Sequence, residues 1–520
     1  MSQRISGVLS LVLVFLLAGA CPVQAQSSDA KVLLEEAATA MGGTQTLRSV
    51  KNEVVESQGK QFEHAQAKQP GGPARQTTEF RYTATRDLNQ PRLRLEWDAR
   101  ILYPRDDSLR YVEIIDGSVG LLQEGGSGAG GKQSRLHPAR LASRLREEKR
   151  AAAKIILVAL GQKSLKRLPD AALDGSSYRV LAFQDSGDEF RIYLDSKTKL
   201  PARVDILEDD PLEGDSLFTL RYADWRKVDG VMLPFSLRYE LNGQPLQEEQ
   251  IKSAKHNVAV AAESFTVPAG IRNEKPDAKP IASQWLLRRV GPNLSHQDVG
   301  RNPPVELVRL AEGVHHALGT THNSVIIEMR DHLVVVEAPL YEERSQAVIK
   351  TVKERFPGKP IRYIIQTHHH IDHSGGIRGY MAEGAVLLVP AMSTEFYTRV
   401  AKAPHTLRPD SLQKNPRAVL IESHTGRRVL TDGSRQIEII PLPTSHAEDF
   451  QLIYLPSEKI LIEADHVSPR KNQIRPAPLA KELLQGIEQL KLDVGTIAGI
   501  HGDTGDMQGL RAAVAKAGQQ

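Results

Sequence analysis

The segment from residue 367 to residue 376 places five histidine and aspartate side chains in six consecutive positions. It reads Thr-His-His-His-Ile-Asp-His-Ser-Gly-Gly, and a cluster of this kind can bind metal ions. Alternate residues of an extended chain point to the same side, so His368 and His370 can approach one ion together. Asp372 and His373 follow where the chain turns at the two glycines, and they can reach a second ion nearby. Imidazole and carboxylate ligands in this mixture suit Zn²⁺, with Fe²⁺ or Mn²⁺ as alternatives.

His369 lies between two of these residues and points to the opposite side, so it is predicted not to bind metal. A solvated run of surface histidines is the alternative explanation of the cluster. The chain has one cysteine, Cys21, which excludes a thiolate cage and leaves histidine and carboxylate as the available ligands. Fourteen of the 17 histidines lie between His296 and His501, which places the chemistry in the C-terminal half.

The elements before the cluster are typical of an open α/β sheet. Hydrophobic patterning predicts buried strands, one helix and a last strand that runs directly into the cluster, at residues 325–327, 333–336, 342–356 and 361–365. Polar side chains at the carboxyl end of such a strand lie where open α/β sheets bind ligands. His322 and Asn323 precede the first strand near this edge, so either can contact a substrate.

The cluster and the segments after it resemble the metallo-β-lactamase superfamily of hydrolases over about residues 305–505. The His-x-His-x-Asp-His signature is followed by His446 after a predicted strand at 436–440, by Asp465 after a predicted hairpin, and by His501 after a helix at about 478–491 and a further strand. The resemblance implies an αββα sandwich with a dinuclear site at one edge of its two sheets.

The resemblance also implies a ligand set for two Zn²⁺ ions. The first ion would be held by His368, His370 and His446, the second by Asp372, His373 and His501, and Asp465 would bridge both. Water held between the two ions would lose a proton near neutral pH and act as the nucleophile. Asp372 is the expected catalytic residue, because it could orient that hydroxide or shuttle its proton. No residue is assigned to substrate binding.

Known metallo-β-lactamases usually lack an aspartate at the position of Asp465. Hydrolysis of an ester, lactone, thioester or amide-type bond is therefore favoured over β-lactamase activity. The 36 positions from Asp465 to His501 leave no room for the additional domain of the nuclease branch. A net charge of +4 over 520 residues also gives no basic surface for nucleic acid. The expected partner is therefore a small-molecule substrate. A mononuclear iron dioxygenase of the same fold is an alternative.

The N-terminal half, residues 27–267, is predicted to contain helices and an antiparallel sheet, which makes the whole chain α+β. Apolar and polar residues alternate at 218–222 and 235–241, and Asn242-Gly243 indicates a tight hairpin. A single helix is expected at 139–160. The order of the predicted strands and the sequence of residues 222–234 resemble the half-barrel domains of periplasmic lipoprotein carriers. That resemblance implies an apolar cleft for a lipid or other apolar ligand, and a carrier or scaffold with an accessory metal site is the alternative function.

Residues 1–25 are predicted to be a signal peptide, with Arg4, an apolar run and a small-x-small pattern ending at Ala25. This predicts a periplasmic or secreted protein, and it disfavours the glutathione thioesterase branch, whose substrate is cytosolic. A lipoprotein anchor at Cys21 is the alternative, although the large aliphatic residue expected three positions earlier is missing. Six prolines in residues 268–304 predict a linker before a hydrolase domain at 305–520. The sequence contains no pattern that indicates the oligomeric state.

Overall fold

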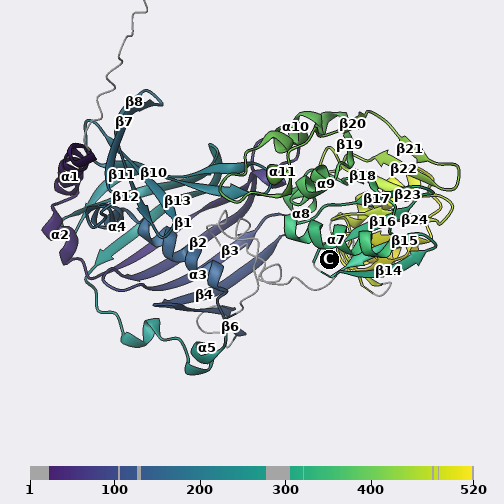
Figure 1. Ribbon diagram of the computed structural model, residues 1–520. Coiled ribbons are helices and arrows are strands. Elements are labelled where there is room, and N and C mark those ends of the chain that lie inside the picture. Colours follow the sequence, from purple (N-terminus) through teal and green to yellow (C-terminus); the bar gives the residue numbers. More distant parts are fainter. Residues whose placement is uncertain are drawn as a thin grey trace, which may run out of the picture.

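The computed structural model describes residues 23–103, 106–125, 131–276, 305–319, 321–470, 473–477 and 479–517. Residues 1–22 of the predicted signal peptide and most of the predicted linker lie outside these ranges. The last three residues of the predicted signal peptide lie in the first helix, which begins at Val23. Figure 1 shows a large curved sheet with helices in the N-terminal half and a layered α/β body in the C-terminal half, which confirms the α+β class. No helix in the described ranges is both long and apolar enough to span a membrane.

The N-terminal sheet has thirteen strands within the described residues, and each strand pairs antiparallel with its neighbours. Its order is β6-β5-β4-β3-β2-β1-β13-β12-β11-β10-β9-β8-β7. Consecutive strands are neighbours in each half of the sheet, and the pairing of β1 with β13 joins the two halves. The bounds are β1 (Asn52–Glu63), β2 (Arg75–Asp87), β3 (Arg92–Ile101), β4 (Asp107–Asp116), β5 (Val119–Glu124), β6 (Gln133–Arg135), β7 (Lys166–Leu173), β8 (Ser176–Asp185), β9 (Asp188–Asp195), β10 (Pro201–Asp210), β11 (Gly214–Val228), β12 (Val231–Leu241) and β13 (Gln244–His256).

The apolar face of this sheet is covered by helices, because alternate residues of its strands are apolar and need a partner layer. Leu34 of the first helix, Met41 directly after it and Ile156 of the fourth helix pack against buried residues of β8 to β13. The helices are α1 (Val23–Ala40), α2 (Thr44–Ser49), α3 (Pro138–Lys149) and α4 (Ala152–Leu160). The hairpin predicted at Asn242-Gly243 is present, with φ of 49° and 81° at its two residues.

The single helix predicted at 139–160 is wrong, because the chain breaks between α3 and α4 at Arg150 and Ala151. Arg150 is fully buried and donates from its guanidinium to the carbonyl oxygen of Val204 at 3.0 Å. Its own carbonyl oxygen accepts a hydrogen bond from the hydroxyl of Tyr222 instead of one within a continuous helix. The buried cation is thus held between the helices and the sheet, and the helix is interrupted at Arg150 and Ala151.

A short helix, α5 (Ala269–Asn273), lies within the interval predicted to be a linker. Its Ile271 and the preceding Val267 are buried against Val112, Ile114 and Leu121 of the N-terminal sheet. Residues up to at least 273 therefore pack with the N-terminal half. Between β13 and this helix lies the 3₁₀ turn η2 (Ala262–Phe265).

Two sheets form the centre of the C-terminal half. The first has the order β14-β15-β16-β17-β18-β19-β20 and the second β21-β22-β23-β24-β27-β28. The bounds of the first sheet are β14 (Glu306–Ala311), β15 (Val314–Leu318), β16 (Ser324–Glu328), β17 (Leu333–Val336), β18 (Ile361–Ile365), β19 (Val386–Pro390) and β20 (Ile421–His424). Those of the second are β21 (Arg428–Thr431), β22 (Gln436–Pro441), β23 (Gln451–Leu455), β24 (Ile460–Glu463), β27 (Thr496–Gly499) and β28 (Thr504–Gly505), and a small ribbon pairs β25 (Pro469–Arg470) with β26 (Gln473–Ile474).

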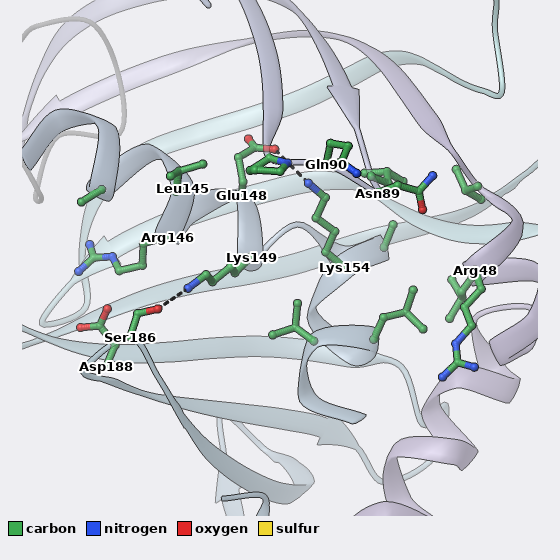
Figure 2. A pocket seen from close by; sticks show the side chains of 18 residues that line it. Arg48, Asn89, Gln90, Leu145, Arg146, Glu148, Lys149, Lys154, Ser186 and Asp188 are labelled. Carbon is green, nitrogen blue, oxygen red and sulfur yellow. Dashed lines mark hydrogen bonds and ion pairs between the residues drawn. The ribbon is translucent and has the colours of Figure 1, made fainter. Parts of the chain in front are cut away.

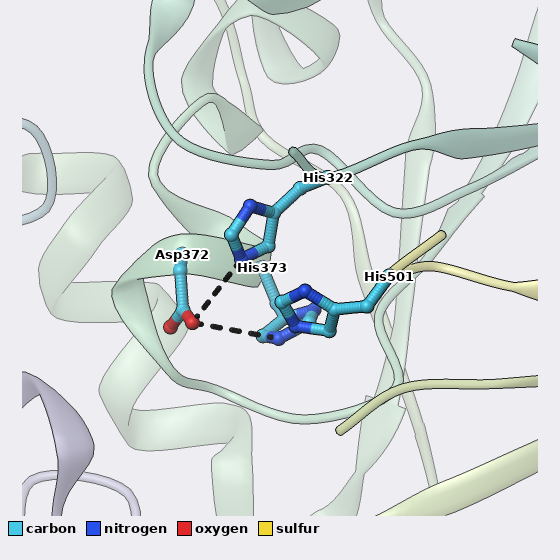
Figure 3. Close-up of side chains that lie close together, drawn as sticks. All are labelled: His322, Asp372, His373 and His501. Atoms are coloured by element: carbon cyan, nitrogen blue, oxygen red, sulfur yellow. Dashed lines mark hydrogen bonds and ion pairs between the residues drawn. The ribbon is translucent and has the colours of Figure 1, made fainter. Parts of the chain in front are cut away.

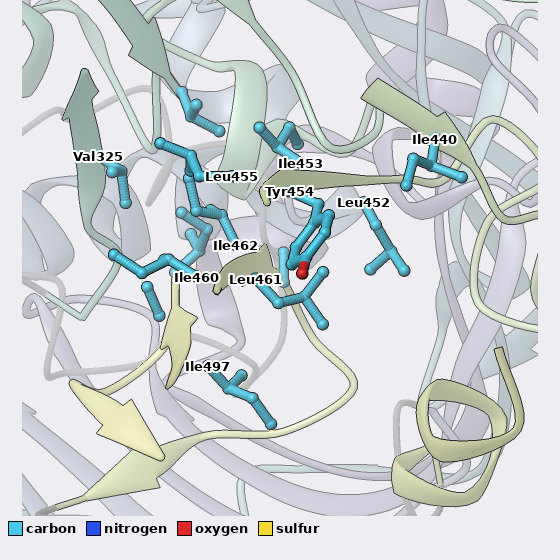
Figure 4. Close-up of a cluster of buried hydrophobic side chains, with 14 of the residues drawn as sticks. Val325, Ile440, Leu452, Ile453, Tyr454, Leu455, Ile460, Leu461, Ile462 and Ile497 are labelled. Carbon is cyan, nitrogen blue, oxygen red and sulfur yellow. The ribbon is translucent and has the colours of Figure 1, made fainter. Parts of the chain in front are cut away.

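The inner faces of these two sheets meet in one apolar core, part of which Figure 4 shows. Val334 and Val336 of β17 point into that core, whereas Leu333 and Val335 point to the outer helices, as the two-residue period of a strand requires. Helices lie on both outer sides, which gives the αββα order that the resemblance to the metallo-β-lactamase superfamily implies. They are α7 (Glu342–Arg355), α8 (Ile371–Ser374), α9 (Ile377–Glu383), α10 (Thr394–Lys402) and α11 (Ser411–Lys414) on one side, and α12 (Ala480–Gln489) and α13 (Met507–Ala517) on the other.

Candidate metal centre

The histidine cluster lies at the carboxyl end of β18, as the sequence predicts. The strand ends at Ile365, and His368 and His370 follow in the extended connection before α8. Asp372 and His373 lie on α8, whose single turn directs both side chains to the same edge of the two sheets. The second sheet brings His446, Asp465 and His501 to this edge from the ends of β22, β24 and β27.

One group of donor atoms belongs to His368, His370 and His446, all of which are buried. His368 Nε2 lies 2.9 Å from His370 Nδ1 and 3.1 Å from His446 Nε2. Asp465 Oδ2 lies 3.3 Å from Nε2 of both His368 and His446. Four donor atoms thus face a common point, a number that suits tetrahedral coordination.

A second group consists of His322, Asp372, His373 and His501, and Figure 3 shows their side chains converging. Asp372 Oδ2 lies 3.3 Å from His322 Nε2 and 3.7 Å from His373 Nε2. Three of these residues were predicted from the sequence, whereas His322 was expected only as a substrate contact. His322 reaches the group because an isolated antiparallel β-bridge pairs its backbone with that of His501, and these two segments are far apart in the sequence.

Asp465 lies between the two groups. Its Oδ2 is 2.7 Å from His373 Nε2, and its Oδ1 is 2.9 Å from His501 Nε2. The residue has a φ of 66°, a strained conformation for an aspartate that directs its carboxylate into the cluster. The seven side chains predicted to bind metal are therefore together, with Asp465 in the central position.

The donor atoms fit divalent cations. Despite their short separation, His373 Nε2 and Asp465 Oδ2 are buried atoms without a hydrogen bond in the described structure, and such atoms are costly unless an ion satisfies them. Burial, together with neighbouring histidines, lowers the pKa of His368 and His370 well below the ordinary value, which keeps both imidazoles neutral. Burial acts to raise the pKa of Asp465, but His373, His446 and His501 lower it overall, so the carboxylate is ionised.

Other residues hold the imidazoles in the tautomer that metal binding needs. His373 Nδ1 donates to Glu337 Oε2 at 2.8 Å, which directs Nε2 at the cluster and makes it the nitrogen that a metal ion would occupy in place of a proton. Burial acts to lower the pKa of His373, but Asp465, Glu337 and Asp372 raise it well above the ordinary value. Glu337 is fully buried, and its other oxygen accepts from the main-chain N–H of Thr367 at 2.6 Å. His368 Nδ1 lies 3.0 Å from the hydroxyl of Thr367, again on the side away from the cluster.

The N-terminal half supplies further contacts that sequence reasoning missed. His370 Nε2 donates to the carbonyl oxygen of Ala67 at 2.9 Å, which fixes Nδ1 as the nitrogen that faces the cluster. Gln66, in the 3₁₀ turn η1 (His64–Gln66), donates from Nε2 to Asp372 Oδ1 at 2.5 Å. The hydroxyl of Tyr103 lies 2.5 Å from His446 Nδ1, and the guanidinium of Arg75 lies 4.1 Å from the centroid of the Tyr103 ring.

His369 belongs to neither group of donor atoms. Its Nδ1 lies 2.8 Å from Asp449 Oδ1, and Ser393 donates to the other oxygen of that carboxylate at 2.9 Å. The side chain of His369 is buried, so its role is in the packing behind the centre.

Comparison with known proteins agrees with this geometry. The family model of the metallo-beta-lactamase superfamily matches residues 317–501. Alkyl/aryl-sulfatase BDS1 of Saccharomyces cerevisiae is 32% identical over 81 residues, which are 15% of this chain and 12% of that protein. A linear primary-alkylsulfatase of Pseudomonas sp is 33% identical over 64 residues, 12% of this chain and 10% of that protein. Both alignments thus span only a small part of the relative's length.

Solved structures to which part of the chain is similar include the metallo-beta-lactamase FIM-1 from Pseudomonas aeruginosa in its mono-zinc form. It has a TM-score of 0.33 and 17% identity, over 42% of this chain and 97% of that chain. The sec-alkyl sulfatase PisA1 has a TM-score of 0.31 and 18% identity, over 41% of each chain.

Proposed function

We propose that the protein is a hydrolase that uses two divalent metal ions, because residues 317–501 match the family model of the metallo-beta-lactamase superfamily. The observation that carries this proposal is the convergence of seven buried or half-buried His and Asp side chains in two groups around Asp465. Zinc is the proposed metal, with iron or manganese as alternatives, because imidazole and carboxylate donors accept all three.

His368, His370 and His446 would hold the first ion, Asp372, His373 and His501 the second, and Asp465 would contact both. When bound, such ions supply a Lewis acid and a water of lowered pKa. A carboxylate between two cations offsets their mutual repulsion, which explains why an aspartate is directed there at the cost of a positive φ.

Asp372 is the proposed catalytic residue among the side chains of this centre. Its Oδ1 accepts from Gln66 and its Oδ2 faces the second group of donor atoms, so the carboxylate is held at a fixed orientation. Burial acts to raise the pKa of Asp372, but His373 and His322 lower it well below the ordinary range. An ionised carboxylate in this position can accept a hydrogen bond from an attacking water and orient it.

The proposed substrate is a small molecule with an ester, lactone, thioester or amide-type bond. Two relatives are named as alkylsulfatases, which adds alkyl sulfate esters to the bonds that need testing. The proposed location is the periplasm or the extracellular space, because residues 1–25 have the pattern of a signal peptide. Detection of a chain beginning at Gln26 in the exported fraction would test that location.

A substrate panel tests the activity directly. Zinc-reconstituted protein and a matched chelator-treated sample would be incubated with a carboxylic ester, a lactone, a thioester, a β-lactam and an alkyl sulfate. Turnover of one class by the metal-loaded sample alone is expected. Asp465→Asn, which keeps the shape and removes the central charge, should reduce that turnover strongly. Failure of all classes with a protein that holds two equivalents of metal would contradict the proposal.

A second candidate function is a carrier of an apolar ligand, and one cavity in the N-terminal half favours it. The cavity has a volume of about 1020 Å³ and lies between α2, α3, α4 and the turn from β2 to β3. Figure 2 shows its polar rim, where Lys149 bonds to Ser186 and Arg48 and Lys154 add positive charge. Its walls are apolar and include Leu47, Val50, Leu88, Ala153, Leu157 and Val158.

Binding of a fluorescent fatty acid would distinguish the two candidate functions. A carrier should bind the probe with the same affinity before and after chelation of the metal. Ala153→Trp, which places a large side chain in the cavity, should weaken probe binding and leave ester or sulfate-ester hydrolysis intact. If the probe does not bind the unmodified protein, the carrier function is contradicted.

A further inference from the structure

His322 occupies a position that the metal-binding signature does not include. It lies two residues before β16 and pairs through its backbone with His501, so two histidines from segments 179 positions apart are neighbours at one edge of the sandwich. The centroids of their rings are 4.1 Å apart, and the ring of His322 lies 5.4 Å from that of His373. The side chain is buried, with 6% of its surface exposed.

The orientation of His322 is that of a ligand. Its Nδ1 lies 2.8 Å from the hydroxyl oxygen of Thr321, which can accept the proton of that nitrogen. The opposite nitrogen, Nε2, faces the second group and lies 3.3 Å from Asp372 Oδ2, so it can offer its lone pair to an ion bound there in place of a hydrogen bond to that carboxylate. One donor atom from each of His322, Asp372, His373 and His501 lies within 4.8 Å of the other three. Figure 3 shows the four side chains directed toward one another.

We propose that His322 is a further protein ligand of the second metal ion, so that three imidazoles and two carboxylates hold this ion. The inference rests on the dinuclear centre proposed above and adds one residue to it. The first ion would have three imidazoles and the Asp465 carboxylate, a set suited to tetrahedral coordination. The second ion would have five protein donors and would therefore favour a higher coordination number. The two positions would then differ in metal preference, because coordination number and geometry separate the divalent ions.

A cysteine substitution tests whether residue 322 reaches the ion. Cys21 is the one cysteine in the sequence, so a Cys21→Ser background makes an introduced thiol unique. In the cobalt-loaded protein, His322→Cys should produce a thiolate-to-cobalt charge-transfer absorption, because a cysteine thiolate binds such ions readily. His332→Cys is the matched control, since His332 lies in the turn between β16 and β17, is bonded to Asp331 at 2.7 Å, and belongs to neither donor group.

Metal affinity gives a second and independent measurement. His322→Ala should weaken binding of one of two zinc equivalents at least tenfold in a chelator competition, because loss of even an outer partner of a ligand typically costs ~10–100-fold. The other equivalent should stay within about twofold of the unmodified protein. This variant also decides the question if the cysteine variant does not fold, provided that thermal unfolding shows the alanine variant to be folded.

The outcomes separate this inference from the proposed function. A charge-transfer band with His322→Cys, or a selective loss of one equivalent with His322→Ala, supports ligation even if every substrate on the panel fails. Two equivalents bound within about twofold of normal affinity by His322→Ala would overturn it and would leave His322 as a substrate contact. A folded, fully cobalt-loaded His322→Cys protein without the band would overturn it as well. Binding of a single equivalent by the unmodified protein would overturn both the dinuclear centre and this inference.

Discussion

The imidazole of His370 donates a hydrogen bond of 2.9 Å to the carbonyl oxygen of Ala67, although 303 positions separate the two residues. A carbonyl oxygen can only accept, so this contact requires the proton of His370 to be on Nε2 and leaves Nδ1 for a metal ion. Glu448 strengthens the junction, because its main-chain N–H donates to the carbonyl oxygen of Lys68 at 2.8 Å. The N-terminal half thus determines the protonation of a side chain in the C-terminal centre.

The contact between Tyr103 and His446 should affect metal binding in the same way. Tyr103→Phe removes the oxygen that lies 2.5 Å from His446 Nδ1 and leaves that buried nitrogen without this partner. Zinc affinity at the first position should fall roughly tenfold, within the range known for partners of metal ligands. Tyr178→Phe on β8 is the control and should change nothing. Equal zinc affinity of both variants in a chelator competition would refute the positioning role of Tyr103.

Asp465→Asn should be the most damaging conservative substitution in the centre. It removes the negative charge between the two proposed ions while the side chain keeps nearly the same shape. A loss of metal affinity or turnover of at least ~10–100-fold is expected, since a direct ligand should cost no less than an outer one. Zinc content after gel filtration and initial rates on the best substrate would measure this loss.

His369→Ala should separate stability from metal binding. Because His369 contacts Asp449 and is buried, its removal leaves a cavity and a carboxylate with one bonded partner fewer. We expect a loss of about 1–3 kcal/mol of unfolding free energy, with zinc content unchanged. Urea unfolding and elemental analysis of the same sample would check this. A variant with normal stability and depleted zinc would show that the assignment of the cluster's two faces is reversed.

Acid should destabilise the N-terminal half through Glu113. Burial acts to raise the pKa of Glu113, but Arg140 and Arg144 lower it from 4.5 to about 2. A carboxyl whose folded pKa is lowered contributes stability that is full above its unfolded pKa and is lost as the pH falls toward the folded value. The contribution, on the order of 3 kcal/mol, should therefore be lost between about pH 4.5 and pH 2.

Glu113→Gln should remove this acid dependence and destabilise the protein by about 3–5 kcal/mol at pH 7, because two buried guanidinium groups lose their counter-charge. Asp98→Asn is the matched control. Asp98 also pairs with two arginines, Arg81 and Arg110, but these pairs are exposed and should contribute little. Unfolding curves at pH 7, 4.5 and 3 would compare the variants. Parallel pH profiles for the unmodified protein and Glu113→Gln would exclude Glu113 as the source.

Removal of metal should lower the stability of the C-terminal half selectively. Zinc at 100 times its dissociation constant would stabilise a folded site by about 2.7 kcal/mol. Calorimetry with and without a chelator should therefore shift the transition of the C-terminal half and leave that of the N-terminal half nearly unchanged. An unchanged thermogram would contradict a metal centre built into the sandwich.

Elements could be predicted from the sequence where apolar and polar residues follow a local pattern. The strand predicted at 361–365 has the same bounds in the structure, because a short β-branched run between Pro360 and a polar segment has one reasonable interpretation. His322 and Tyr103 were not predicted in their places, since each depends on contacts with segments far along the chain. The Ala67 contact could not be predicted at all, because it is made by a main-chain carbonyl that every residue type possesses.

The turn that carries Ala67 connects β1 to β2, and the large apolar cavity lies at the other ends of the same two strands, beside Leu47 and Leu88. At 3.3 Å per residue, the length of β1 separates the two places by about 40 Å. A ligand that altered the twist of these strands from the cavity end would therefore displace the Ala67 carbonyl at the other end. Linkage between binding equilibria is reciprocal, so zinc would then change the affinity of the cavity for that ligand by the same factor.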